Sequence, residues 1–108
     1  MTFDQYQEEA VKTAIYDAEH SIIYPALGLA NEAGEVLGKI KKVLRDNNGD
    51  FNEDNRVAIG KEIGDVLWYM AALSRDLDIR LSDTAHDNIQ KLRDRQARGV
   101  IGGSGDTR

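Results

Sequence analysis

EAGEVL, residues 32–37, and EIGDVL, residues 62–67, are two matching stretches that predict how this chain folds. Each stretch places two carboxylates at positions i and i+3, which lie next to each other on one side of an α-helix. Each pair is followed directly by apolar residues that need a hydrophobic core. We therefore expect two core helices, each with a pair of acids along its flank.

Helical periodicity dominates the rest of the chain, and β-branched residues never alternate over a strand-length window. The pattern predicts an all-α fold, an antiparallel four-helix bundle or a close relative of it. We expect residues 1–98 to form a single domain and the glycine-rich tail 99–108 to be mobile. The predicted helices run from about Asp4, as N-cap, to Glu19, from near Pro25 to about Arg45, from about Asp54 to Leu77, and from a cap at Ser82 and Asp83 to Gly99.

Composition narrows the range of functions. The chain has 108 residues, of which 41% are hydrophobic and 31% charged, with a net charge of −5. An acidic protein is a poor binder of nucleic acid polymers, whose affinity comes largely from Lys and Arg on phosphates. The chain has no cysteine, no apolar run long enough for a membrane span and no signal-peptide pattern. We expect a cytoplasmic protein that binds neither nucleic acid polymers nor membranes.

The two acid pairs are expected to meet in space. On a helical wheel, each pair lies on the same side of its own apolar stripe. A short turn at residues 46–50 makes the two helices antiparallel neighbours, and an antiparallel pair keeps equivalent flanks on one edge of the interface. The heights of the two pairs above the turn also agree. The four acids should therefore converge: Glu32, Glu35, Glu62 and Asp65.

Four carboxylates in one place need protons or a cation to offset their charge. Ligands that are all oxygen favour Mg²⁺, or Mn²⁺ as a substitute, over zinc. Mg²⁺ also accepts phosphate oxygens, so this arrangement suits a phosphorylated substrate. The alternative is that the acids form solvated edges of a non-enzymatic helical dimerisation or adaptor module. A ferritin-like di-iron bundle is disfavoured because neither acidic motif contains a histidine.

The ordered set of motifs resembles the MazG-like all-α nucleoside triphosphate pyrophosphohydrolases. The resemblance covers nearly the whole chain and rests on the two acidic motifs and on stretches 24–29, 64–69, 88–95 and 102–106. It implies the reaction NTP + H₂O → NMP + PPi on non-standard or surplus nucleotides, a house-cleaning role. It also implies a site in which Glu32, Glu35, Glu62 and Asp65 bind Mg²⁺ while Asn88, Lys91 and Arg95 contact the nucleotide phosphates.

Further roles follow as hypotheses. Glu35 is the candidate base that orients the attacking water. Lys39, on the same flank as the acids, could meet the pyrophosphate or pair with a nearby acid. Tyr69, beside the acids, could stack on a base or simply pack.

Trp68, on the far side of its helix, faces another helix or a partner subunit. Glycines inside the helices favour close backbone approach in a homodimer or a dimer of dimers: Gly34, Gly38, Gly60 and Gly64.

Overall fold

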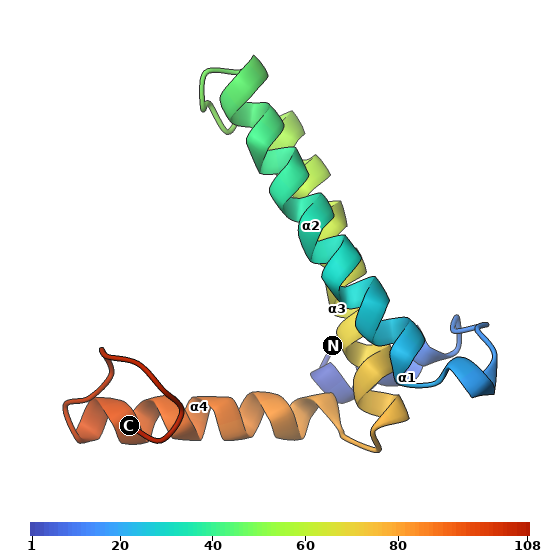
Figure 1. Ribbon diagram of the computed structural model, residues 1–108, viewed down its shortest axis with the longest axis vertical. Helices are drawn as coiled ribbons and strands as arrows, with labels where there is room; N and C mark the ends of the chain where they lie inside the picture. The colour runs from blue at the N-terminus through green and yellow to red at the C-terminus, as the bar shows by residue number, and fades with distance from the viewer.

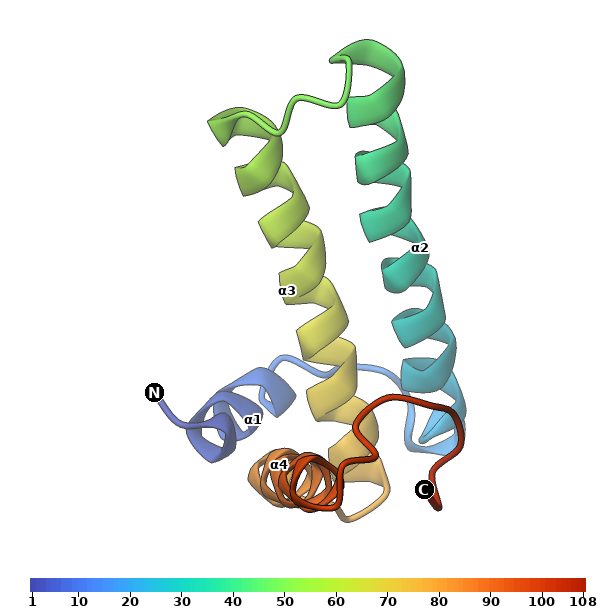
Figure 2. The same cartoon turned by 90° about the vertical axis from the view of Figure 1, so that its left-hand side faces the viewer.

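The computed structural model describes residues 1–108, and these residues are helical without strands. The helices are α1 (Phe3–Val11), the 3₁₀ turn η1 (Ala18–His20), α2 (Ile23–Asp46), α3 (Glu53–Asp76) and α4 (Leu81–Ala97). The all-α prediction is confirmed. The longest helices, α2 and α3, pack side by side as an antiparallel hairpin, with α1 beside its base (Figures 1 and 2).

The turn of the hairpin is made by residues suited to left-handed backbone. Asn48 and Gly49 have φ values of 55° and 75°, conformations that asparagine and glycine adopt most readily. The Gly49 amide donates to the Val43 carbonyl at 3.1 Å, which closes the end of α2. Asn52 caps α3 by accepting a hydrogen bond from the Asn55 amide at 2.9 Å. The predicted turn cluster is therefore confirmed.

The first helix is shorter than predicted. Its N-cap is Thr2, which forms a capping box with Gln5, and the helix ends at Val11 rather than Glu19. The Thr13 hydroxyl donates to the Ala10 carbonyl at 2.7 Å, so a side chain competes with the backbone where the helix stops. Periodicity extended the helix too far because an apolar pattern does not reveal this local competition between a side chain and the backbone.

Hydrogen bonds to Asp76 stabilise the base of the hairpin. Its carboxylate accepts hydrogen bonds from the Tyr16 hydroxyl at 2.8 Å and from the Ile22 amide at 3.0 Å, and Arg75 Nε lies 2.8 Å away. Burial opposes ionisation of Asp76, but these donors outweigh it and lower its pKa. Ile22 has a φ of 71°, so this anchor holds a strained residue just before α2 begins. Pro25 lies buried in the first turn of α2, as expected.

The start of α4 is set by Gln7 of α1. Its amide nitrogen donates to the Ile79 carbonyl at 3.0 Å, and its amide oxygen accepts from the Leu81 amide at 2.9 Å. The helix thus begins at Leu81, after an N-cap at Arg80 that makes no side-chain bond, rather than at the predicted Ser82–Asp83 cap. Leu81 joins Ala10 and Ala71 in the small core that connects α1, α3 and α4.

The fourth helix does not lie along the hairpin. Figure 1 shows α4 leaving the base of α3 and extending to one side, so the single chain is not a closed four-helix bundle. Only 7 of 108 residues are buried, and the expected apolar stripes are partly uncovered. Leu44 and Ile63 of these stripes are 63% and 53% exposed, and Leu37, which lies beside the stripe of α2, is 67% exposed. The hairpin thus carries more apolar surface than its own chain covers.

Candidate metal and nucleotide site

The hairpin brings together three of the four predicted metal ligands. Glu32 lies on α2, and Glu62 and Asp65 lie one turn apart on α3. Each offers a carboxylate oxygen, and these oxygens all lie within 4.8 Å of one another. We call these three residues the acidic cluster. Their meeting follows from the antiparallel packing of two helices whose acids occupy equivalent flanks.

Glu35 is exposed and lies outside the acidic cluster, but its charge still acts on Glu32. Burial raises the pKa of Glu32, and the neighbouring charges of Asp65, Glu62 and Glu35 raise it further. Repulsion of this kind is relieved by a proton or by a cation. Because the donors are all carboxylate oxygens, the cluster fits a hard divalent cation better than a thiophilic one.

Lys39 faces the acidic cluster from α2. Its Nζ lies 3.9 Å from the Glu62 Oε1, and its side chain is 40% exposed. Lys39 also lines a cleft of about 180 Å³ that includes Lys42 and continues toward the turn of the hairpin. Positive charge therefore lies directly beside the acids, on the same edge of the hairpin.

Tyr69 lies next to the cluster and is packed into α2. A Cβ on Gly28 would come within 2.1 Å of the Tyr69 ring, so only glycine leaves room for this side chain. Burial, together with a hydrogen bond to Tyr24, raises the pKa of Tyr69 and keeps its phenol neutral. Gly28 is the helix glycine that a close approach requires. The other helix glycines, by contrast, face open space within the chain: Gly34, Gly38, Gly60 and Gly64.

The predicted phosphate-binding residues of α4 are not brought to the acids within one chain. Asn88 and Lys91 are exposed on a helix that points away from the hairpin (Figure 1). Arg95 is only 5% exposed, and its Nη2 donates to the Asp106 carbonyl at 2.9 Å. The tail therefore folds back over α4 instead of extending freely, and Figure 1 shows it beside the C-terminal end of that helix.

Glycine allows this return of the tail. Gly99 has a φ of 74° and ends α4, and the next amide, from Val100, donates to the Arg95 carbonyl at 2.9 Å. The Asp106 carboxylate then lies 3.8 Å from Arg95 Nη2. In this conformation Arg95 is hydrogen-bonded to the tail and its side chain is not accessible to a nucleotide.

Two residues that the sequence did not assign to the site line a cleft of about 390 Å³ together with Glu32, Asp65 and Tyr69. They are Thr13, which follows α1, and Trp68 of α3. Trp68 was expected to face either another helix or a partner subunit, and within this chain it packs against the core that α1 contributes to. No sequence signal links Thr13 to the cleft, because the end of α1 was not predicted.

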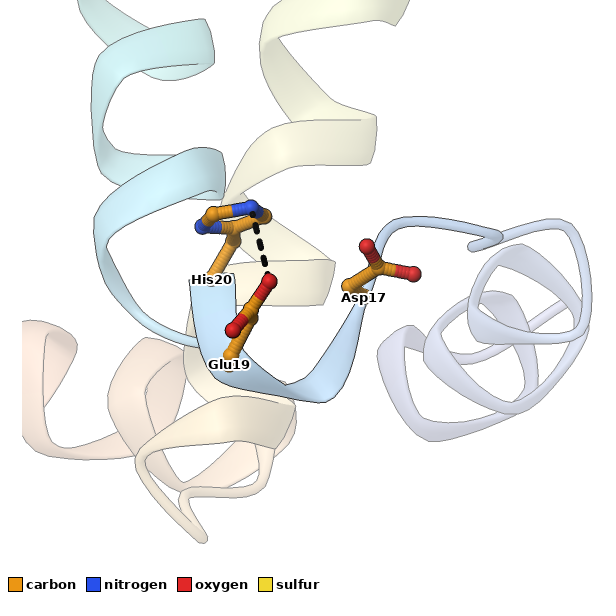
Figure 3. A group of neighbouring side chains, drawn as sticks. All are labelled: Asp17, Glu19 and His20. Atoms are coloured by element: carbon orange, nitrogen blue, oxygen red, sulfur yellow. Dashed lines mark ion pairs between the residues drawn. The ribbon is translucent and has the colours of Figure 1, made fainter.

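A second group of possible ligands lies around η1. Asp17, Glu19 and His20 are all exposed and close together in sequence, and His20 Nε2 is 3.6 Å from Glu19 Oε1 (Figure 3). The group consists of neighbours in one turn, with no buried polar atom aimed into it. It therefore resembles an ordinary exposed acidic turn, whereas the acidic cluster is assembled from two helices.

No helix here combines the length and the apolar character that a bilayer crossing requires. The chain matches the family model described as "MazG nucleotide pyrophosphohydrolase domain" over residues 21–100. It is also 45% identical over 114 residues to the "Gene 37 protein" of Mycobacterium phage L5, covering 100% of both chains. No solved structure matches it. The matched range contains both acidic motifs, the hairpin and α4, and the chain belongs to the MazG nucleotide pyrophosphohydrolase family.

Proposed function

We propose that this protein is a Mg²⁺-dependent nucleoside triphosphate pyrophosphohydrolase that converts (d)NTPs to (d)NMPs and pyrophosphate, in nucleotide-pool house-cleaning. The observation that carries the proposal is the acidic cluster, whose oxygens approach within 4.8 Å on facing helices of the family's domain. Carboxylates held so close together fit a divalent cation that also binds phosphate oxygens. Mn²⁺ would be a working substitute.

Glu32, Glu62 and Asp65 would hold the ion, with Glu35 at the edge of the same site. Bound Mg²⁺ would offset the carboxylate charge and stabilise the charge that develops on the triphosphate. Glu35, exposed and outside the tight cluster, is free to orient a water molecule and accept its proton. The water oxygen bonds to the α-phosphorus, the bond from that phosphorus to the bridging oxygen breaks, and pyrophosphate leaves with the bonding electrons.

Lys39 would stabilise the leaving pyrophosphate. It lies 3.9 Å from Glu62 and opens onto the lysine-lined cleft described above, so it can meet an anion bound next to the ion. Tyr69, on the opposite side of Glu32 and Asp65, would stack against the base. A nucleotide would then lie across the acidic cluster, with its base toward Tyr69 and its terminal phosphates toward Lys39.

A second copy of the chain would complete the site. A folded monomer of 12.0 kDa should expose roughly 6,000 Å². This chain exposes 7785 Å², an excess of about 1,800 Å² that suits one protomer's share of a large homodimer interface. In such a dimer, Asn88 and Lys91 on the projecting α4 could reach the acids of the other chain. A dimer of dimers would bury still more of the apolar surface.

The direct test is a screen for pyrophosphate release from standard and modified NTPs and dNTPs, with Mg²⁺ and with EDTA. We expect pyrophosphate, not single phosphates, to be released with Mg²⁺ and to disappear in Glu35→Ala. If no nucleotide is cleaved and Glu62→Ala leaves Mg²⁺ binding unchanged, the chain is better described as a helical dimerisation or adaptor module with acidic edges.

A further inference from the structure

The cleft of about 390 Å³ beside the acidic cluster has an aromatic wall as well as an acidic one. Trp68 and Tyr69 form the aromatic wall, with their ring centres 5.0 Å apart and their planes at 86° to each other. Glu32 and Asp65 form the acidic wall. The volume lies within the range of small-molecule sites. The cleft therefore suits a ligand with a flat ring at one end and a metal-binding anionic group at the other.

The indole of Trp68 is held by a hydrogen-bonded chain that begins in α1. Trp68 Nε1 donates to Thr13 Oγ1 at 2.7 Å, and Thr13 Oγ1 donates to the Ala10 carbonyl at 2.7 Å. A hydroxyl can donate one hydrogen bond and accept others, and Thr13 Oγ1 does both here. Valine has the same shape as threonine but can do neither.

Packing fixes the other parts of the aromatic wall. Trp68 rests on the small core of Ala10, Ala71 and Leu81, and Tyr69 fills the space above Gly28. In addition to this packing, the hydrogen bond to Thr13 restrains the N–H edge of the indole. Thr13 itself is exposed and takes no part in the core, so its hydrogen bonds are the main contribution it makes here.

We propose that Trp68 contacts the nucleobase and that Thr13 is a positioning residue that holds the indole in place for it. This proposal rests on the proposed function, because the anionic end of the ligand is taken to be the triphosphate at the acidic cluster. Stacking on an aromatic side chain favours binding of any base, because every base has a π-face. The segment that ends α1 would thus help to bind substrate, although no acid or base of the reaction comes from it.

Kinetics of Thr13→Val, with Thr13→Ser as the matched control, test the positioning role. We expect Thr13→Val to raise KM about tenfold, because the Trp68 indole loses its hydrogen bond and is less ordered when the base binds. The kcat should stay within about twofold, because the acids that carry out the reaction are unchanged. Thr13→Ser keeps the hydroxyl and should behave like the wild type. A KM for Thr13→Val equal to that of Thr13→Ser would overturn the positioning role.

Binding without catalysis separates this proposal from the proposed function. Trp68 is the one tryptophan in the chain, so its fluorescence reports on the cleft. With EDTA present, we expect the common ribo- and 2′-deoxynucleosides, which carry no phosphate for the acids to repel, to quench it, and the midpoint to rise about tenfold in Thr13→Val. Glu62→Gln should keep the quenching even where it abolishes turnover. Pyrophosphate release without any quenching would overturn the role of Trp68 and leave the proposed function standing.

Discussion

The α2–α3 hairpin and the α4 arm, by which we mean α4 with its tail 99–108, carry opposite parts of the expected nucleotide site. The hairpin brings carboxylate oxygens of Glu32, Glu62 and Asp65 to within 4.8 Å of one another inside one chain. The arm holds Asn88 and Lys91 out in solvent and uses Arg95 to bind its own tail. The expected metal ligands are thus brought together within a single chain, whereas the expected phosphate contacts of the arm would reach them only from a partner chain or after a rearrangement.

Loss of one acid should have the largest effect. Glu62→Ala removes a carboxylate oxygen from the acidic cluster, and we expect kcat/KM for pyrophosphate release to fall about 1,000-fold or more. Glu53→Gln is the control, because Glu53 is an exposed acid on the same helix, outside the cluster, and should keep most of the activity. A Glu62→Ala enzyme within tenfold of the wild type would contradict the assigned role of the cluster.

Mixing two inactive variants tests whether the two halves of the site come from different chains. Glu62→Ala lacks the acidic half and Lys91→Ala lacks the basic half, so each should be nearly inactive alone. In a homodimer that shares its sites, half of randomly mixed dimers are mixed, and each of these has one intact site.

Equal mixing with chain exchange should therefore restore about a quarter of the wild-type activity. If Lys91 serves the acids of its own chain, every site keeps one defect and the mixture stays inactive. A Lys91→Ala enzyme with full activity would show instead that the arm takes no part in the reaction.

The hairpin could be predicted because its determinants are local. A short turn and two periodic stripes fix the antiparallel packing, and the side on which Glu32 and Glu62 lie follows from helical geometry alone. The direction of α4 depends on different interactions. It is set by Gln7, more than sixty residues away in sequence, and by Asp78, a non-glycine residue with a φ of 57°.

The same distinction explains the unexpected state of Arg95. Its position on α4 follows from periodicity, but its burial depends on a glycine-rich segment returning to it, which no periodic pattern encodes. The sequence left open whether Trp68 faces another helix or a partner subunit, and its hydrogen bond to Thr13 required knowing where α1 ends. Contacts between distant segments, rather than the helices themselves, account for what the sequence did not reveal.

The contacts of Asp76 in the hairpin and of Asp106 in the arm should differ in how much they contribute to the free energy of unfolding. Asp76 has a side chain only 5% exposed and accepts three hydrogen bonds at the base of the hairpin. Asp76→Asn should lower the free energy of unfolding by about 2 kcal/mol, because the remaining donors lose a charged acceptor. Asp106 in the tail is 95% exposed and binds Arg95 through its backbone carbonyl.

Asp106→Asn should therefore change the free energy of unfolding by less than about 0.5 kcal/mol. Urea denaturation of both variants measures the difference. Equal losses would mean that the Asp106 carboxylate, and not only its backbone carbonyl, contributes to holding Arg95.

The smallest expected effect is a pH dependence of stability that belongs to the hairpin alone. The pKa of Glu32 is raised in the folded state, above its ordinary value of 4.5, first by burial and then by the charges of Asp65, Glu62 and Glu35. As the pH falls from neutral through this raised pKa, the folded chain therefore takes up a proton before the unfolded chain does. Stability from this group increases as the pH falls, which is opposite to the effect of a paired carboxylate such as Asp76.

Thermal unfolding in EDTA, compared between the wild type and Glu32→Gln, isolates this contribution because the other acids are common to both. Glu32→Gln should have the higher Tm at pH 7, and the difference should shrink as the solution is acidified. Mg²⁺ should raise the Tm of the wild type more than that of Glu32→Gln, because the ion relieves the same repulsion that protonation relieves. A Tm difference that does not change with pH would mean that the acids of the hairpin do not repel one another, and the electrostatic argument for a cation between them would fail.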